Sequence, residues 1–587
     1  MSRRRHAGIS AVAMGALLLA ACGSIGGGTA DPDAGGELAL AITIGVEQLP
    51  DGYNAFTADS GSVVNAYVNN LTQQGFTTLL PDGSIEPNSV FGSYEKTSDD
   101  PLTVRYTFAA DAVWSDGTPI DFDDALLTWA ARSGTYTSGE VDADGAPVAL
   151  FTASNTSGWD AVAKPVGEPG DRSFTLTFAA PFADWEVLAD GFMPAHVAAE
   201  QGGLSAADDG AALVAAIESD DVAALAGVAA FWNAGWAYQE NLPALPDAAL
   251  IPASGPYAYA SASGGTLTLH RNEKWWGEPG ATESIVFTAV DAAEMVQALA
   301  NGEIDSFDPA NPTADMVAQL ADLGPDVVVE TGESYAYSHI DLDSRAGGLF
   351  EDARVRQAFL TCVPRQELVD KFAAPITATA QLLNLREFLP AQAEYDAVLA
   401  AVPSATLYDR VDLDGAAQLL EQAGVAAPVQ VRLLYAEQSG LRADQVALIK
   451  ASCDQAGFDV VGQPAQDLFG VLAEPGTWDA ALFGWTGSGL VTENQAFYVT
   501  GGGLNYGGYS NATVDALWDQ IVTVADRAAA VPLKTELEEE LWADPYNVML
   551  YATPGLTAHS ARVSGPGYNP TQSGSTWNAQ TWTKSAG

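Results

Sequence analysis

The strongest constraint on the fold is a stretch around residue 450 in which the chain alternates between the apolar period of a helix and that of a strand. A helical stripe runs over 416–423 and stops at Gly424, and residues 429–435 then carry an apolar side chain at every second position. The cycle repeats as a helix over 442–456 and strands over 458–461 and 480–485. Strands separated by helices usually pair in parallel, so this stretch predicts a mixed α/β fold.

Composition sets the class of protein. The chain has 587 residues, of which 48% are hydrophobic and 17% charged, so it can bury a large core and is neither disordered nor a bundle of membrane helices. Asp and Glu number 75 against 24 Lys and Arg, a formal net charge of -51. A surface this acidic repels phosphate backbones, which argues against a nucleic-acid partner.

The N-terminus has the form of a signal peptide. Three arginines at 3–5 precede an apolar run over 7–21, and the run is shorter than the roughly 18 to 20 residues that a spanning helix needs. We find no longer apolar run downstream. The sequence therefore predicts export of the remaining chain, with 1–21 as the signal peptide.

The end of the apolar run, Leu19-Ala20-Ala21-Cys22, resembles the lipobox of bacterial lipoproteins. That resemblance implies that Cys22 is acylated and becomes the first residue of the mature chain; the alternative is ordinary secretion with an incidental cysteine. Residues 22–36 are rich in Gly and lack apolar periodicity, which indicates a flexible tether. We expect the body to be held by lipid at the extracytoplasmic face of the cell membrane.

Two cysteines remain in the body. Cys362 and Cys453 each lie on the apolar stripe of a predicted helix. They form either one disulfide, as export allows, or two buried free thiols, because sequence alone does not show whether the two helices touch.

Motifs for catalysis are missing from the sequence. None of the five histidines has another four residues away, as a shared metal on one helix would need, and Ser488 lacks the upstream glycine of a nucleophile elbow. A calcium-loop-like run at 140–145 fails because its twelfth position is Phe151. The sequence therefore predicts a protein that is not an enzyme and has no cofactor or metal site.

Several phrases in order resemble one family. Residues 104–129 read VRYTFAADAVWSDGTPIDFDDALLTW, which is similar to the strand, Ser-Asp-Gly-Thr-Pro turn and helix of family 5 extracellular solute-binding proteins, the peptide and nickel class of ABC importers. The likeness extends over nearly all of 37–587 through GPY (255–257), LTLHRNEKWWG (267–277), NGEID (301–305), FEDARVRQAFLTCVPRQELV (350–369), GFDV (457–460), WDAALFGW (478–485), NYGGYSN (505–511) and LWADP (541–545).

The resemblance implies a periplasmic-binding-protein-like clamp of type II, in which two α/β lobes close around a ligand and one lobe carries an extra subdomain. We expect the chain to cross between the lobes at 334–343 and again near 545–551. The predicted parts are lobe 1 over 37–333 with an inserted subdomain at about 63–247, lobe 2 over 334–547, and a return to lobe 1 over 548–587.

The implied function is a monomeric receptor that delivers an oligopeptide or another small polar or amphipathic solute to the permease of an ABC importer. Two alternatives stay open: a cell-envelope lipoprotein that binds glycolipid or glycan without a transporter, and a surface hydrolase.

The resemblance also suggests where ligand binds. In peptide-binding members an acid shortly after the Gly-Trp of the WDAALFGW-like phrase pairs with the α-ammonium group, but here Ser488 stands at that position, with Glu493 as the alternative alignment. A serine does not offset the desolvation of an ammonium ion, so sugars, glycolipids or peptides bound differently become admissible ligands.

The candidate ligand-binding residues come from four segments. Tyr335 and Tyr337 share one face of a predicted strand with His339, where they either line the cleft or pack under a loop. The full set is Asp59, Ser60, Tyr335, Tyr337, Trp485, Ser488, Asn505 and Tyr506.

Overall fold

The computed structural model describes residues 41–57, 62–141, 147–205, 210–524 and 527–585. Cys22, the tether, Asp59 and Ser60 lie outside the described residues.

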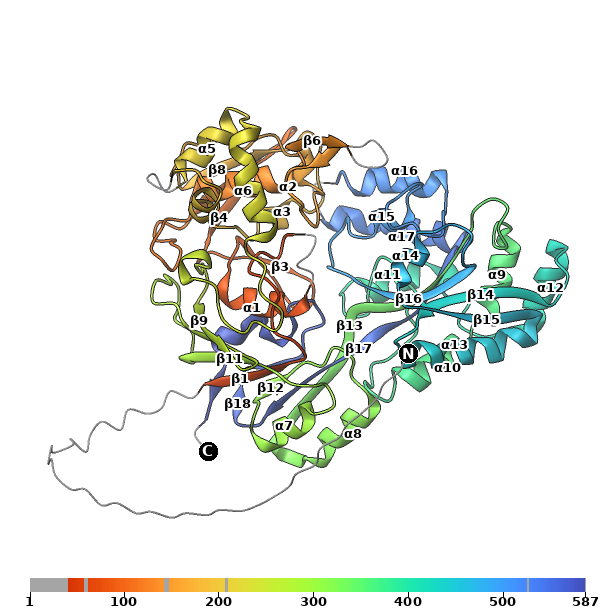
Figure 1. Ribbon diagram of the computed structural model, residues 1–587. Coiled ribbons are helices and arrows are strands. Elements are labelled where there is room, and N and C mark those ends of the chain that lie inside the picture. The colour runs from red at the N-terminus through yellow and green to blue at the C-terminus, as the bar shows by residue number, and fades with distance from the viewer. Residues whose placement is uncertain (1–40, 58–61, 142–146, 206–209, 525–526, 586–587) are drawn as a thin grey trace, which may run out of the picture. The chain divides into compact units, whose positions relative to one another are not determined.

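Ten strands of the described chain form one mixed sheet (Figure 1). The sheet order is β15 (Phe458–Ala465), β14 (Val429–Ala436), β16 (Ala480–Thr486), β13 (Val327–Leu342), β17 (Asn547–Ser560), β12 (Ser306–Phe307), β1 (Ile42–Val46), β11 (Ser284–Ala289), β10 (Thr266–Arg271) and β9 (Tyr257–Ser263). We call β14 to β16 the β14 half and β1 with β9 to β12 the β1 half; β13 and β17 lie between them.

β13 and β17 connect the two halves. They pair antiparallel from Val327 opposite Ser560 to Asp341 opposite Asn547, and the pairing is interrupted between Glu333 and Tyr337. On one side of the interruption β13 also pairs with β16, and on the other side β17 pairs with β12. The two long strands therefore join the halves, with a break in their hydrogen bonding between them.

A pair of facing glycines precedes this break. Gly332 of β13 lies opposite Gly555 of β17, and a Cβ atom at either position would come within 2.4 Å of Tyr568. The ring of Tyr568 thus covers the glycines, in space that larger residues would fill.

The β14 half confirms the α/β prediction. β14 pairs in parallel with both β15 and β16. Helix α12 (Leu413–Ala423) ends at Gly424 with φ 72°, and α13 (Gly440–Cys453) is followed by a 3₁₀ turn and Gly457 with φ 95°. The glycines accept the left-handed conformation that ends a helix, which is why the apolar period located both ends well. The other helices of the chain from β13 to β17 are α9 (Ala353–Cys362), α10 (Arg365–Phe372), α11 (Tyr395–Ala401), α14 (Leu468–Leu472), α15 (Gln495–Tyr498), α16 (Ala512–Ile521) and α17 (Arg527–Ala543).

Of the two alternatives for the body cysteines, the structure has the disulfide. Cys362 at the end of α9 and Cys453 at the end of α13 are bonded, with their Cα atoms 4.9 Å apart and both side chains fully buried. The bond closes a sequence separation of 91 residues across the β14 half.

Between β1 and β9 the chain builds a separate hydrophobic core on small sheets. The strand, turn and helix expected at 104–129 are present as β5 (Leu102–Phe108) and α2 (Phe122–Arg132). Asp121 caps α2: its Oδ1 accepts from the Asp123 amide at 3.0 Å, and its own amide donates to Asp124 Oδ2 at 3.1 Å.

The remaining elements belong to this segment and to the β1 half. The small sheets are β2 (Thr77–Leu79) with β3 (Ile85–Pro87), β4 (Gly92–Asp99) with β5 and β8 (Ser173–Thr177), β6 (Thr137–Val141) with β7 (Pro147–Ala149), and β18 (Val563–Ser564) with β19 (Thr583–Lys584). The helices are α1 (Val63–Thr72), α3 (Trp185–Leu188), α4 (Ala195–Gln201), α5 (Ala211–Glu218), α6 (Val222–Ala234), α7 (Met295–Asn301) and α8 (Ala314–Asp322).

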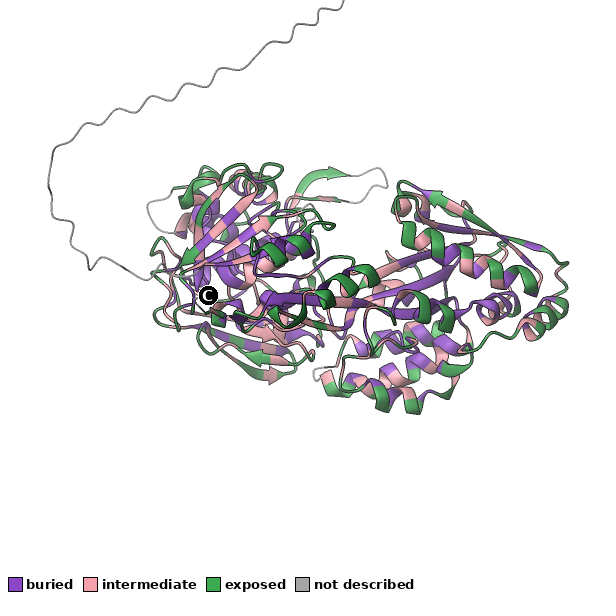
Figure 2. Ribbon diagram, turned by 90° about the horizontal axis from the view of Figure 1, so that it is seen from below, coloured by how far each residue is buried: buried purple, intermediate pink, exposed green. Residues whose placement is uncertain are grey.

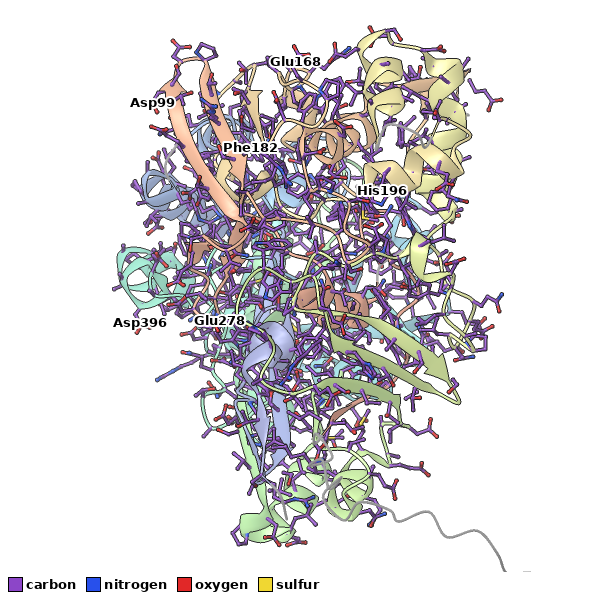
Figure 3. All side chains as sticks on the ribbon, turned by 90° about the vertical axis from the view of Figure 1, so that its left-hand side faces the viewer. Asp99, Glu168, Phe182, His196, Glu278 and Asp396 are labelled. Carbon is purple, nitrogen blue, oxygen red and sulfur yellow. A yellow bond between two sulfur atoms is a disulfide. The ribbon has the colours of Figure 1, made fainter. Side chains whose placement is uncertain are left out.

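Burial follows the sheet, and acids cover the outside. Figure 2 shows buried residues gathered on the strands and exposed residues on the outer faces of helices. Asp99, Glu168 and Glu278 are exposed, and Figure 3 shows Asp99 and Glu168 near the upper edge of the molecule. A search of the described residues for a helix of membrane-spanning length and apolarity gave no candidate.

We predict that the disulfide stabilises the β14 half strongly. Closing so long a loop is worth about 4–5 kcal/mol in the loop-entropy model, so Cys362→Ala with Cys453→Ala should unfold at a clearly lower guanidinium concentration. Fluorescence-monitored denaturation measures the shift. An unchanged midpoint would show that the bond contributes little to stability.

Candidate ligand-binding site

A cavity of about 540 Å³ lies along the middle of β13 and β17. Its wall combines the end of β1 and the start of α1, the chain after β12, Ser334 and Ala336 of β13, residues 553–557 of β17, and the segment 568–574. We call it the main cavity. Both halves of the sheet contribute to its wall, through residues such as Val46 and Thr486.

A second cavity of about 270 Å³ adjoins the first on the β14 half. Ala336, Thr486 and Thr553 line both cavities, so the two cavities adjoin at these residues. We call it the side cavity. Its wall includes Tyr337, Ser338, Arg442, Trp485 and Tyr551.

Aromatic rings form the floor beside the side cavity. The ring of Trp485 stacks on Phe497 with centroids 5.0 Å apart, and it lies parallel to Tyr506 at 6.5 Å. Phe483 contacts Trp485 edge-on at 5.4 Å. This arrangement offers a flat apolar surface to a ligand side chain or sugar face.

The structure brings together three of the predicted site residues. Tyr337 and Trp485 are partners in the β13–β16 register and both line the side cavity, and Tyr506 stacks on Trp485. Tyr335 is fully buried and lines neither cavity. It lies close to Gly83 and Gly489, so it packs under a loop, which is the second of the two alternatives that the sequence left open.

A break in the side-chain alternation along β13 explains this difference. Ser334 and Ala336, the neighbours of Tyr335, present small side chains to the main cavity. The interrupted pairing between Glu333 and Tyr337 breaks the regular alternation, so Tyr335 and Tyr337 do not serve the same surface.

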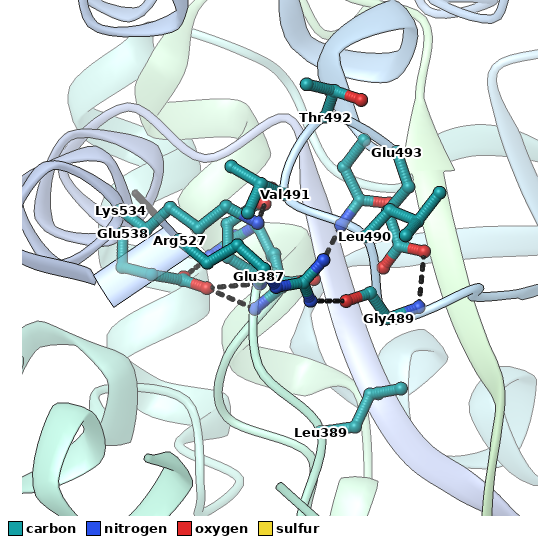
Figure 4. Close-up of polar contacts among 12 residues, drawn as sticks. Glu387, Leu389, Gly489, Leu490, Val491, Thr492, Glu493, Arg527, Lys534 and Glu538 are labelled. Atoms are coloured by element: carbon teal, nitrogen blue, oxygen red, sulfur yellow. Dashed lines mark hydrogen bonds and ion pairs between the residues drawn. The ribbon is translucent and has the colours of Figure 1, made fainter. Parts of the chain in front are cut away.

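Ser488 and Glu493 bind each other. The Glu493 carboxylate accepts from the Ser488 amide and from Ser488 Oγ at 2.6 Å. It also accepts from the Gly489 amide at 2.9 Å (Figure 4). Neither residue lines the main or the side cavity. Glu493 is thus committed to its own turn.

Asn505 organises a loop. Its Nδ2 donates to the carbonyl oxygens of Val499 at 3.0 Å and Tyr509 at 2.8 Å, and its Oδ1 accepts from the Tyr509 amide at 2.9 Å. Asn505 is buried and lines neither cavity, so its contacts are those of a structural residue.

The carboxylate of Asp184 connects the segment before β9 to the segment after β16, beside a hydrogen bond from the Ala183 amide to the Val522 carbonyl at 3.2 Å. Asp184 Oδ1 accepts from the Val491 amide and from Arg527 Nη1, both at 2.9 Å, and Oδ2 accepts from the amide and hydroxyl of Thr492 at 3.0 and 2.9 Å. Arg527 also donates to the Gly489 carbonyl at 2.6 Å (Figure 4). Asp184 is only 2% exposed, so these bonds are shielded from water.

Two buried ion pairs lie next to the turn at 488–493. Arg386 pairs with Glu538 at 3.5 Å, and Lys534 of α17 pairs with Glu387 at 3.0 Å (Figure 4). Burial raises the pKa of Glu538 to about 7, and the charge of Arg386 opposes that rise. Asn494 Nδ2 donates to the Arg386 carbonyl at 3.2 Å, which ties this cluster to the turn.

Sequence reasoning missed several cavity residues, namely Tyr67, Asp308, Arg442, Tyr551 and Tyr568. The available signal was weak: Asp308 lies three residues after the family-like phrase at 301–305, and Arg442 opens a predicted helix. Nothing in the local pattern separates these side chains from ordinary surface residues.

Comparison with known proteins identifies relatives of the whole chain. The model of bacterial extracellular solute-binding proteins, family 5 Middle, matches residues 88–506. An uncharacterised lipoprotein of Mycobacterium bovis is 27% identical and the alignment covers 99% of each chain; the oligopeptide-binding protein OppA of the same organism is 24% identical over 89% of this chain and 81% of its own.

A solved structure shares the fold. The periplasmic EDTA-binding protein EppA superposes with a TM-score of 0.78 at 22% identity, covering 93% of this chain and 96% of that one. The two-lobed fold expected from the sequence is thereby confirmed.

We predict that Asp184 stabilises the form in which these two segments touch. Asp184→Ala leaves the Arg527 guanidinium and three donors of 491–492 without their acceptor, which should destabilise this form by about 3–5 kcal/mol. Small-angle scattering of the variant should then give a larger radius of gyration than wild type.

Glu186→Ala is the matched control, because Glu186 is a nearby acid with no described hydrogen bond to 489–527. The control should scatter like wild type. Identical curves for Asp184→Ala and wild type would contradict the prediction.

Proposed function

Because the chain belongs to the family 5 bacterial extracellular solute-binding proteins, we propose that it is a lipid-anchored receptor that delivers a solute to an ABC importer. The ligand is an oligopeptide or another small polar or amphipathic solute. The observation that carries the proposal is the main cavity, whose wall comes from both halves of the sheet at the point where two strands join them. A ligand held there contacts both halves at once.

Hinge closure is the proposed mechanism. The interrupted pairing around Ser334 to Ala336 and the glycine pair beside it supply a place where β13 and β17 can bend. The hydrogen bonds of Asp184 then hold the two sides together over the ligand. Movement of the β14 half toward the β1 half would enclose the solute without any covalent step.

Family 5 solute-binding proteins bind their ligands without turnover, and we extend this to the present chain. Permease subunits of an importer are its proposed protein partners, and it acts as a monomer. We retain the lobe boundaries 37–333, 334–547 and 548–587, with the subdomain at about 63–247, as part of the proposal.

The test begins with the ligand that the protein retains. Native mass spectrometry of protein purified from its own host should show a bound solute, which would be identified and then removed by unfolding and refolding. Adding it back should lower the radius of gyration and raise Tm. A retained glycolipid or glycan would favour the envelope-binding alternative, and unchanged scattering at saturating ligand would contradict closure.

We also predict that Cys22 carries the membrane anchor. Cys22→Ser removes the acylation site, so the variant should leave the membrane pellet and appear in the soluble fraction. The mature body is strongly acidic and should not bind an anionic membrane by charge. A variant that still sediments with membranes in high salt would contradict the lipid anchor.

A further inference from the structure

A third cavity, of about 330 Å³, lies beside a different face of α1 from the one that lines the main cavity. This face carries Ala66, Asn69, Asn70 and Gln73. The rest of the wall comes from segments 55–56, 74–79, 190–191 and 573–580. Of the described lining residues, none lines the main or the side cavity, and none comes from the chain between β13 and β17. We call it the amide cavity.

Carboxamide side chains dominate the wall of the amide cavity. They belong to Asn69, Asn70, Gln73 and Gln74 at α1 and to Gln580 of the 3₁₀ helix Gly574–Thr581. A carboxamide carries a hydrogen-bond acceptor and a donor side by side. The wall therefore offers acceptors and donors in pairs without net charge.

Two of these carboxamides hold the wall together. Asn70 Nδ2 donates to the Ser573 carbonyl at 3.1 Å and to Thr576 Oγ1 at 3.2 Å, which ties α1 to the 3₁₀ helix. Gln73 Nε2 donates to the Tyr53 carbonyl at 2.9 Å. These bonds fix the wall in the absence of any ligand.

The oxygen atoms of two other carboxamides are buried without a partner. No described residue donates to Asn69 Oδ1 or to Gln580 Oε1. Buried polar atoms are rarely left unpaired, because each loses its bonds to water. Both oxygens line one cavity, so they indicate a ligand that carries hydrogen-bond donors.

The described wall offers no unpaired charge. Asp190 is its charged residue, and the Asp190 carboxylate accepts from the Thr77 amide at 3.0 Å and from the Thr77 hydroxyl. Burial raises the pKa of Asp190 to about 7, and the hydrogen bonds from Thr77 oppose that rise together with the charge of Arg132. Because this acid is already bonded and no base lines the described wall, a neutral ligand fits better than an ion.

An indole ring completes the wall. Trp577 is half-buried, and among the described residues no second ring stacks on it. Phe56 lines the same cavity, but the Arg132 guanidinium lies over its ring at 4.7 Å. The ring of Trp577 is therefore the aromatic surface that a ligand can cover.

A sugar ring matches this wall. Each hydroxyl group donates one hydrogen bond and accepts others, so two adjacent hydroxyls meet the oxygen and the nitrogen of one carboxamide. The C–H groups of the same ring pack against an aromatic face. Pockets for small molecules span about 300–1,000 Å³, so the amide cavity is at the lower end, where one sugar ring fits and an extended chain does not.

We propose that the amide cavity binds one neutral sugar unit, with its hydroxyl groups at Asn69 and Gln580 and its C–H face on Trp577. The inference goes beyond the proposed receptor function, because the described wall belongs to the chain before β13 and after β17. A sugar therefore occupies this site whether or not a solute is enclosed in the main cavity. The protein has an accessory site for a free sugar or for one sugar unit of a larger glycan.

The experiment uses the full chain labelled with 5-fluorotryptophan, in a detergent without a sugar head group. Trp577→Phe and Trp485→Phe each remove one fluorine resonance and so assign it. Methyl pyranosides of glucose, galactose and mannose are then titrated and followed by fluorine NMR. At least one of them should shift the Trp577 resonance saturably and leave the resonance of Trp485, in the side cavity, in place.

Substitution of the two carboxamides tests their role. Asn69→Ala and Gln580→Ala should each raise the sugar concentration at half-saturation about tenfold, as the loss of one hydrogen-bonding group does. Gln418→Ala, at an exposed carboxamide of α12, is the matched control and should titrate like wild type.

Thermal unfolding without sugar separates binding from a structural role. The oxygens of Asn69 and Gln580 have no partner among the described residues, so both alanine variants should keep a Tm near that of wild type. A lower Tm with an unchanged sugar titration would make these side chains structural and overturn the assignment.

The source of the sugar is decided by size. The trisaccharide built from the responding sugar is titrated in the same way as its methyl pyranoside. A stronger response to the trisaccharide identifies one unit of a glycan as the ligand, and a weaker response identifies a free monosaccharide.

Three other results would overturn the proposal. A sugar that shifts only the Trp485 resonance binds in the side cavity. A shift of Trp577 with N-acetylalanine methylamide and with no pyranoside would make the amide cavity a site for peptide groups. No shift with any pyranoside would leave water as the partner of the two oxygens. Solute retention and hinge closure are tested separately, by native mass spectrometry and scattering.

Discussion

The antiparallel pairing of β13 with β17 is the interaction on which the rest of the structure depends. These two strands are hydrogen-bonded to the β14 half at one end and to the β1 half at the other, so the two halves that line the main cavity are joined through the same pair of strands. Where their ladder is interrupted, backbone and small side chains face the main cavity in place of a closed sheet surface. The main cavity therefore lies where the pairing of β13 with β17 is interrupted for a few residues.

The sequence predicted the parts of the fold that follow from a local period. Helices ending at Gly424 and Gly457, and the strands after them, were located because apolar spacing and helix-ending glycines act within a few residues. The same reasoning left Tyr335 undecided between lining the cleft and packing under a loop, because an irregular register changes which face a side chain takes and no local sequence pattern shows that irregularity. The disulfide stayed undecided for a similar reason, since it depends on two helices that meet from distant parts of the chain.

The site was predictable only in part. Trp485, Tyr337 and Tyr506, three of the candidate ligand-binding residues, lie together because two of them are register partners on adjacent strands and the third stacks on Trp485. Asp308 and Arg442 were missed, since their place in a cavity wall depends on segments that meet only in the folded protein. Ser488 departs from the family pattern in a way the structure explains. Its amide and hydroxyl both donate to the Glu493 carboxylate, so Glu493 is bonded within its own turn and does not face either cavity.

The Asp184 contact has a kinetic consequence. Its donors come from one short turn and one arginine and converge on two oxygen atoms, so a separation of a few ångströms breaks all of these bonds together. A half-engaged arrangement retains almost none of their energy and exposes a buried carboxylate and a guanidinium at the same moment. Under the proposed closure this geometry favours two discrete states without a stable intermediate, and the residence time of an enclosed solute would then depend on how often the Asp184 carboxylate loses its partners.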